Sequence, residues 1–229
     1  MFLRSIVIGA AAAALLAAPA SAEVTLDPLK RCYVVAREDQ REFVSINAHG
    51  FTKLTKVDLF IDEIQQPDNV QTLFDGSLSG TVLAPWVDSG QRVFTVRLAE
   101  EGKPENSVTG VSNVTRFSVE QVPRAAKTDD KVRFTGRGFT DAAPVYAHYV
   151  FNGKSSKTVT IGWPKGDCGT FNVRRKQFPF KQRPKVGLWT IQFDQLKDYN
   201  PQAAKQVPMT IRVKKAPKTR TKRTPARSH

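Results

Sequence analysis

Two stretches of the chain, 88 residues apart, share alternating apolar residues that lead into a glycine-phenylalanine-threonine corner. The first runs from Val44 to Lys53 and the second from Val132 to Asp141. Alternation indicates a strand with one buried face, and the closing glycine indicates a turn that glycine adopts at little cost. Because an internal repeat determines the architecture, we expect two copies of one folding unit.

The correspondence continues beyond the corner. Asp75-Gly76-Ser77-Leu78 corresponds to Asp167-Cys168-Gly169-Thr170-Phe171, and the strand after Gly90 corresponds to residues 187–193. Short alternating strands about 8–12 residues apart, without long helical periodicity, predict an all-β chain of two tandem immunoglobulin-like β-sandwich domains. We expect the domains at residues 23–121 and 122–213, with a lead-in strand over 24–36 and a closing strand of the first domain that ends at residues 116–119.

The two ends of the chain lack the strand pattern of the repeats. Residues 1–22 have a positive start, an apolar run and a small-residue site, which predicts a signal peptide cut before Glu23. An uncleaved membrane anchor is the alternative, and no later run is long enough to span a membrane. Residues 214–229 are basic and rich in proline, which predicts a disordered tail.

Charge is distributed unevenly along the chain. Residues 23–123 hold 10 basic and 15 acidic residues, residues 124–213 hold 17 and 6, and residues 214–229 hold 7 and none. This asymmetry favours an anionic partner or self-association, and the alternative is a basic surface with no single partner.

The chain has two cysteines, Cys32 and Cys168, one in each expected domain. Export permits a disulfide, which would connect the two domains. The alternative is a pair of buried thiols, because sequence separation does not show whether the two Cα atoms approach within about 7 Å.

A basic stretch late in the chain, interleaved with Phe178, Phe180 and prolines, continues into the tail. Cations attract polyanions by releasing counterions, so the stretch predicts polyanion binding, and a merely solubilising tail is the alternative. The predicted polyanion-binding residues are Arg174, Arg175, Lys176, Lys181, Arg183, Lys185, Lys214, Lys215, Lys218, Arg220, Lys222 and Arg223.

No catalytic set, metal site or cofactor site is apparent in the sequence. The three histidines are His49, which aligns with Arg137 of the second copy, His148 within a predicted strand, and the terminal His229. They do not have the spacing of metal ligands, and two distant cysteines cannot form a zinc site. We therefore expect a protein that is not an enzyme and has no metal or cofactor.

The strand, the Gly-Phe-Thr corner, Asp167-Cys168-Gly169-Thr170-Phe171 and Gly187-Leu188-Trp189-Thr190-Ile191 together resemble bacterial immunoglobulin-like modules that open on a Gly-x-Gly-Phe corner. Over residues 24–213 the chain resembles exported two-domain proteins of high-GC Gram-positive bacteria. The resemblance implies the fold and export, and it implies no particular activity. The first copy departs from the pattern, with Ala48 where the second has Gly136.

These observations favour a non-enzymatic, extracytoplasmic module for cell-envelope binding or adhesion, held to anionic envelope polymers by its basic second domain and tail. Export argues against an intracellular nucleic acid as partner. The alternative is an accessory or inhibitor protein that binds another exported protein through a sheet face, for which Tyr146 and His148 are candidates.

Overall fold

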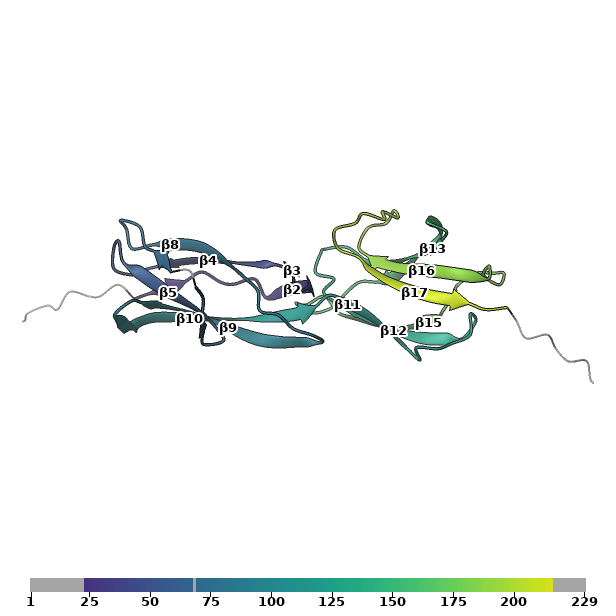
Figure 1. The fold of residues 1–229 in the computed structure, drawn as a ribbon, viewed down its shortest axis with the longest axis horizontal. Helices are drawn as coiled ribbons and strands as arrows, with labels where there is room; N and C mark the ends of the chain where they lie inside the picture. The colour runs from purple at the N-terminus through teal and green to yellow at the C-terminus, as the bar shows by residue number, and fades with distance from the viewer. Residues whose placement is uncertain (1–22, 68, 216–229) are drawn as a thin grey trace, which may run out of the picture.

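A computed structural model describes residues 23–67 and 69–215. These residues form strands, turns and loops, without a helix. The expected signal peptide and residues 216–229 of the basic tail lie outside the described residues. Two immunoglobulin-like β-sandwiches follow one another along the chain, and Figure 1 shows them end to end. The predicted fold class is therefore confirmed.

The first sandwich packs a small sheet against a larger one. In spatial order, the small sheet contains β1 (Thr25–Leu26), β4 (Phe43–His49) and β8 (Leu78–Leu83). The larger sheet contains β3 (Gln40–Arg41), β2 (Cys32–Arg37), β10 (Lys103–Arg116), β9 (Gln91–Glu100), β5 (Lys56–Ile61) and β6 (Ile64–Gln65), with β7 (Val70–Gln71) also paired to β5.

The second sandwich has the same two-layer construction with fewer strands. One sheet contains β11 (Ser118–Val122), β12 (Lys131–Arg137) and β15 (Phe171–Lys176). The other contains β14 (Lys154–Gly162), β13 (Val145–Phe151), β16 (Gly187–Asp194) and β17 (Val207–Val213).

Each sandwich has its own hydrophobic core. Along β4 the side chains alternate strictly, with Val44, Ile46 and Ala48 buried and the residues between them exposed. Along β12, Val132 and Phe134 are buried in the same way. Full burial of a side chain such as Val or Phe contributes about 1.5–3 kcal/mol, so this alternation fixes which face of each strand points inward.

The repeated corner has the same construction in both copies. Gly50 and Gly138 adopt φ angles of 90° and 87°, which lie in the region that favours glycine. The phenylalanine that follows each glycine is buried, and its backbone N–H donates to the carbonyl of a later glycine: Phe51 to Gly76 and Phe139 to Gly169. The repeat predicted from sequence is therefore a structural repeat.

Two strand predictions are corrected. The lead-in strand expected over 24–36 is two strands in different sheets, because β1 pairs with β4 while β2 runs parallel to β10. Pro28 lies between them and lacks the N–H that a continuing ladder needs. The closing strand expected to end at residues 116–119 is also divided, since β10 ends at Arg116 and β11 begins at Ser118 and pairs with β12. The division expected after residue 121 thus falls within β11.

The two sandwiches are connected by a disulfide and by side-chain contacts, in addition to the continuous backbone. Cys32, at the start of β2, and Cys168, in the loop before β15, form a disulfide with Cα atoms 5.2 Å apart. Val34 of the first sandwich packs in the core of the second. Lys205 adds an ionic contact across the joint, with its Nζ 3.8 Å from Glu42 of the first sandwich and 3.0 Å from Asp141 of the second.

Candidate functional site

The outer surface of the β11-β12-β15 sheet carries rows of like charge. Lys131 of β12 lies opposite Lys176 of β15, and Arg133 lies opposite Arg174. All four side chains are exposed because they alternate with inward residues such as Phe134. Like charges directly opposite one another destabilise a sheet, so local stability does not explain this pattern. We call these four residues the basic face.

Few negative charges balance the basic face. The three strands place one carboxylate, Glu120, on this surface, opposite Thr135. None of the four basic side chains forms an ion pair with a carboxylate of the described residues. The basic face therefore presents net positive charge to solvent.

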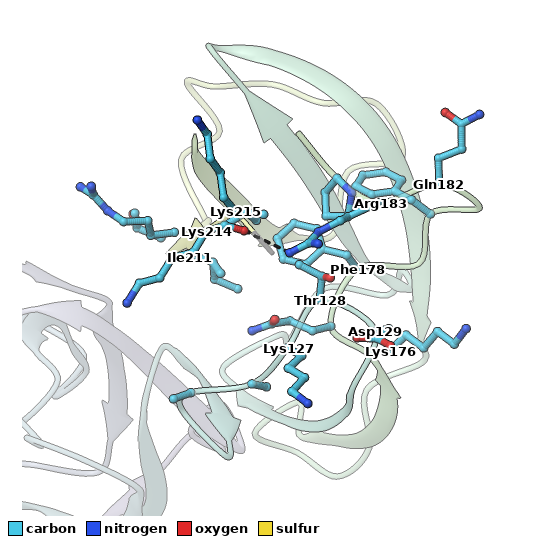
Figure 2. Close-up of a pocket in the computed structure, with 18 of the residues that line it drawn as sticks. Lys127, Thr128, Asp129, Lys176, Phe178, Gln182, Arg183, Ile211, Lys214 and Lys215 are labelled. Carbon is cyan, nitrogen blue, oxygen red and sulfur yellow. Dashed lines mark hydrogen bonds between the residues drawn. The ribbon is translucent and has the colours of Figure 1, made fainter. Parts of the chain in front are cut away.

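A hollow of about 950 Å³ adjoins the basic face at the end of the second sandwich. The pairs Lys131–Lys176 and Gly187–Val213 are at this end, whereas Cys168 contacts the first sandwich at the opposite end. Asp129 is the single acidic residue of its lining. Its basic lining residues are Arg124, Lys127, Lys176, Lys181, Arg183, Arg212, Lys214 and Lys215. We call this hollow the basic groove, and Figure 2 shows Lys214 and Lys215 across it from Lys176.

Aromatic packing holds the 177–186 connection that forms one wall of the basic groove. Phe178 and Phe180 both pack against Trp189, with ring centroids 5.5 and 5.3 Å from the indole. The Trp189 Nε1 donates a hydrogen bond of 2.8 Å to the Lys185 carbonyl. Arg183 Nη2 donates to the Lys214 carbonyl at 3.1 Å, drawn as the dashed line in Figure 2. The cations of this connection are thus carried on a segment fixed to the core.

The same connection is tied to the residues before β12. Backbone N–H groups of Gln177 and Phe178 donate to the carbonyls of Asp130 and Thr128. The buried side chain of Gln177 donates through Nε2 to Gln121 Oε1 at 3.3 Å, while its own Oε1 has no partner among the described residues. Hydrogen bonds thus connect the 177–186 connection to residues 128–130, the segment that leads into β12.

Arg175 has a different role from its neighbours in sequence. Its guanidinium donates to the carbonyls of Thr160 and Ile161, at 2.6 and 2.8 Å, and so connects β15 to β14 of the other sheet. Burial raises the pKa of Tyr149 well above its ordinary value, and the positive charge of Arg175 acts in the opposite direction. Arg175 is therefore engaged within the protein.

The structure groups only some of the residues predicted from the linear sequence. Arg174 belongs to the basic face, Lys176 to both surfaces, and Lys181, Arg183, Lys214 and Lys215 to the basic groove. Lys185 is exposed on the 177–186 connection. Outside the described residues lie Lys218, Arg220, Lys222 and Arg223.

Sequence reasoning missed the basic residues that come from elsewhere in the chain. These are Lys131 and Arg133 of β12, together with Arg124, Lys127 and Arg212 of the basic groove. Their signal was present, because the repeat strand reads Lys-Val-Arg-Phe-Thr-Gly-Arg, with cations at alternate positions. Recognising the site required the pairing of this strand with β15.

The face that carries Tyr146 and His148 is not the open surface considered for a protein partner. His148 is fully buried, because the 195–206 connection folds over it. Its Nε2 lies 3.1 Å from both Asp194 Oδ1 and the Leu196 carbonyl, and its Nδ1 lies 2.9 Å from Thr158 Oγ1. We therefore correct this expectation: the pair His148–Asp194 holds a connection in place.

Within residues 23–67 and 69–215, no three His, Cys, Asp or Glu residues gather in a way that could hold a metal ion. The same part of the chain contains no helix of the length and apolarity that a membrane span requires.

No protein-family model and no curated protein matches the sequence. Among solved structures, the chain is similar to a Corynebacterium diphtheriae protein provisionally described as membrane anchored, with 11% identity and a TM-score of 0.31. That match covers 83% of this chain, which spans 57% of the length of the Corynebacterium protein.

Two mouse structures are also similar. One is a coronavirus receptor-binding domain complexed with its murine receptor, with 15% identity and a TM-score of 0.25; the other is murine CEACAM1b, with 15% identity and a TM-score of 0.22. Each match covers 84% of this chain and 99% of the other. These TM-scores are too low to support an inference about this chain. Its own strands and charges define it as a tandem immunoglobulin-like protein with a basic face and a basic groove.

Proposed function

We propose that this protein is an exported, non-enzymatic binding module that attaches to anionic polymers of the cell envelope. The observation that carries the proposal is the placement of Arg133 opposite Arg174, and Lys131 opposite Lys176, without neutralising carboxylates. A polyanion would relieve the repulsion that these pairs produce. The basic groove continues the positive surface and lies where the chain leads into the tail.

Salt dependence follows from this arrangement. When a polyanion binds cations, it releases condensed counterions, and each cation engaged lowers the logarithm of the affinity by about 0.9 for every tenfold rise in salt. For the four cations of the basic face, raising salt from 50 to 200 mM should weaken binding by about 100-fold. The basic groove and the tail would make this dependence steeper.

The test is binding of the chain from Glu23 onward to isolated cell envelopes, and to soluble inorganic polyphosphate, at low and high salt. One variant replaces Lys131, Arg133, Arg174 and Lys176 with glutamine. A matched control replaces Lys53, Lys56, Lys154 and Lys197, which are exposed cations elsewhere on the two sandwiches. A third protein lacks residues 214–229.

The proposal requires that the basic-face variant lose most of its binding at low salt, that the matched control keep it, and that removal of the tail weaken it. Equal loss in both glutamine variants would mean that net charge alone drives binding. Attachment that is insensitive to salt would sink the proposal and favour an accessory protein with a specific exported partner.

A further inference from the structure

A second hollow, of about 480 Å³, lies at the other end of the same sheet surface, toward the first sandwich. Thr135 and Arg137 of β12, Asn172 of β15, and Trp163 and Lys165 after β14 contribute to its lining. Thr135 lies opposite Asn172, one outward-facing pair beyond Arg133 and Arg174. The hollow is therefore continuous with the basic face.

Trp163 is the unusual residue of this hollow. It is 64% exposed, whereas Trp189 is buried and pairs its Nε1 with a carbonyl. An indole left in water forgoes the large stabilisation that burial of an aromatic side chain provides. Single exposed apolar residues are common on protein surfaces, so the exposure of Trp163 alone identifies no site. What distinguishes Trp163 is that its indole shares the lining of one hollow with polar and cationic side chains.

Polar groups near Trp163 are available to the same ligand. The side chains of Thr135, Arg137, Lys165 and Asn172 make no hydrogen bond or ion pair with another residue of the described chain. They offer a hydroxyl, an amide and two cations around one aromatic surface. Binding hollows typically combine an apolar wall with a few polar groups that fix orientation.

We propose that this hollow holds one sugar ring of an acidic polysaccharide whose remaining acid groups lie along the basic face. The C–H face of a pyranose would pack on the Trp163 indole, and its hydroxyls would pair with Asn172 and Thr135. Arg137 or Lys165 would pair with a carboxylate of the sugar, a contact that a guanidinium can make through two parallel hydrogen bonds. This inference rests on the proposed function and names the class of polymer.

The spacing of the face suits an extended polymer. Outward-facing pairs along β12 and β15 follow one another at intervals of about 7 Å, since a strand rises about 3.3 Å per residue. A chain seated at Trp163 and running toward the basic groove would pass Arg133 and Arg174, then Lys131 and Lys176. Each step places acid groups near a pair of cations.

A single-stranded nucleic acid is favoured less by the same surface. Sites for such strands combine cations with several aromatic side chains on which successive bases stack. Between Trp163 and the basic groove, the outward residues of β12 and β15 are polar or charged and include no aromatic side chain. One aromatic surface followed by cations fits one stacked sugar and a run of acid groups.

The experiment compares Trp163→Ala with the unchanged chain from Glu23 onward against four probes. The probes are polygalacturonate, inorganic polyphosphate, oligodeoxythymidine and neutral dextran. Trp163→Phe retains an aromatic surface and is the matched control. Because Trp163 is largely exposed, neither substitution should alter the thermal unfolding midpoint, and both variants are checked for this.

We expect Trp163→Ala to weaken polygalacturonate binding about tenfold, because the sugar ring loses its apolar contact with the indole, and to leave polyphosphate binding unchanged. Trp163→Phe should restore most of the affinity, and dextran should not bind. Equal affinities of Trp163→Ala and the unchanged chain for polygalacturonate would overturn the inference, as would a loss confined to oligodeoxythymidine. The basic-face variant tests the proposed function separately, because it should lose affinity for polygalacturonate and polyphosphate alike.

Discussion

Arg133 of β12 lies directly opposite Arg174 of β15, with both guanidinium groups on the outer surface of the sheet. A pair of like charges in this position costs a fraction of a kcal/mol to about 1 kcal/mol relative to a neutral pair. The folded protein therefore contains an unfavourable electrostatic interaction at this pair. A negatively charged partner bound between the two guanidinium groups would make the electrostatic free energy there favourable.

Arg174→Gln should have opposite effects on stability and on binding. Removing one charge relieves the repulsion, so the free energy of unfolding should rise by about 0.2–1 kcal/mol. Polyanion affinity should fall, and the slope of its logarithm against the logarithm of salt should decrease by about 1. Urea unfolding and binding titrations measure the two effects. Lys154→Gln, at the exposed start of β14 and away from the basic face, should change neither, and a destabilised Arg174→Gln would contradict the argument.

Replacing Cys32 and Cys168 together with alanine should lower stability and separate the two cores. The disulfide spans 136 positions, for which the chain-entropy account gives about 5 kcal/mol. Because each sandwich has its own core, calorimetry of the variant should show two transitions at lower temperature. The unchanged protein treated with a reductant should behave in the same way. An unaltered single transition in both samples would show that the noncovalent joint is sufficient.

Asp194→Asn should destabilise the second sandwich and loosen the 195–206 connection. The carboxylate accepts hydrogen bonds from His148 Nε2, the Leu196 N–H and Gln192 Nε2, and an asparagine places an NH₂ group against one of these donors. Leaving a buried polar group unsatisfied costs about 1–3 kcal/mol. Limited proteolysis should show earlier cleavage within 195–206, and Lys197→Gln is the exposed control. If protease resistance is unchanged, the His148–Asp194 pair does not hold the 195–206 connection in place.

Glu100 should make the first sandwich sensitive to acid. Burial alone would raise the pKa of this carboxyl, but hydrogen bonds from Lys103, Thr52 and Asn106 outweigh it and lower the pKa to about 2. A lowered pKa stabilises the fold above the ordinary carboxyl value, and this contribution is lost as the pH falls toward 2.

Glu100→Gln lacks that contribution at every pH. The difference in unfolding free energy between the unchanged protein and this variant should therefore be largest near pH 7 and shrink between about pH 4.5 and pH 2. Urea unfolding at several pH values measures it. A difference that stays constant through this range would contradict the assigned hydrogen bonds.

The corner could be predicted from sequence because its causes are local. A glycine with positive φ followed by a buried phenylalanine leaves the same pattern in both copies. The reason why the first copy has Ala48 where the second has Gly136 became visible only in the structure, because it depends on the residue in the opposite strand. Ala48 lies opposite Leu78, whereas Gly136 lies opposite Phe171, whose ring would be 2.2 Å from a β-carbon at that position.

The candidate site was predicted only in its linear part. The run after Arg174 is visible in the sequence, but Lys131 and Arg133 join it through the register of β12 and β15, which the local pattern does not contain. Arg175 is an error of the opposite kind. It lies in the middle of the basic run and was predicted to bind a polyanion, but its guanidinium donates hydrogen bonds to carbonyls of β14. The split of the lead-in strand likewise depends on partners far along the chain, β4 for β1 and β10 for β2.

The joint between the sandwiches has two covalent paths, one through Phe117 and the other through the Cys32–Cys168 disulfide. A tether with one path swivels freely, whereas a tether with two separated paths resists twisting and bending. If the basic end is attached to a surface, a pull on the first sandwich is therefore shared between both paths. The molecule would then transmit torque as well as tension. It would keep the first sandwich at a constant orientation relative to the second sandwich under flow.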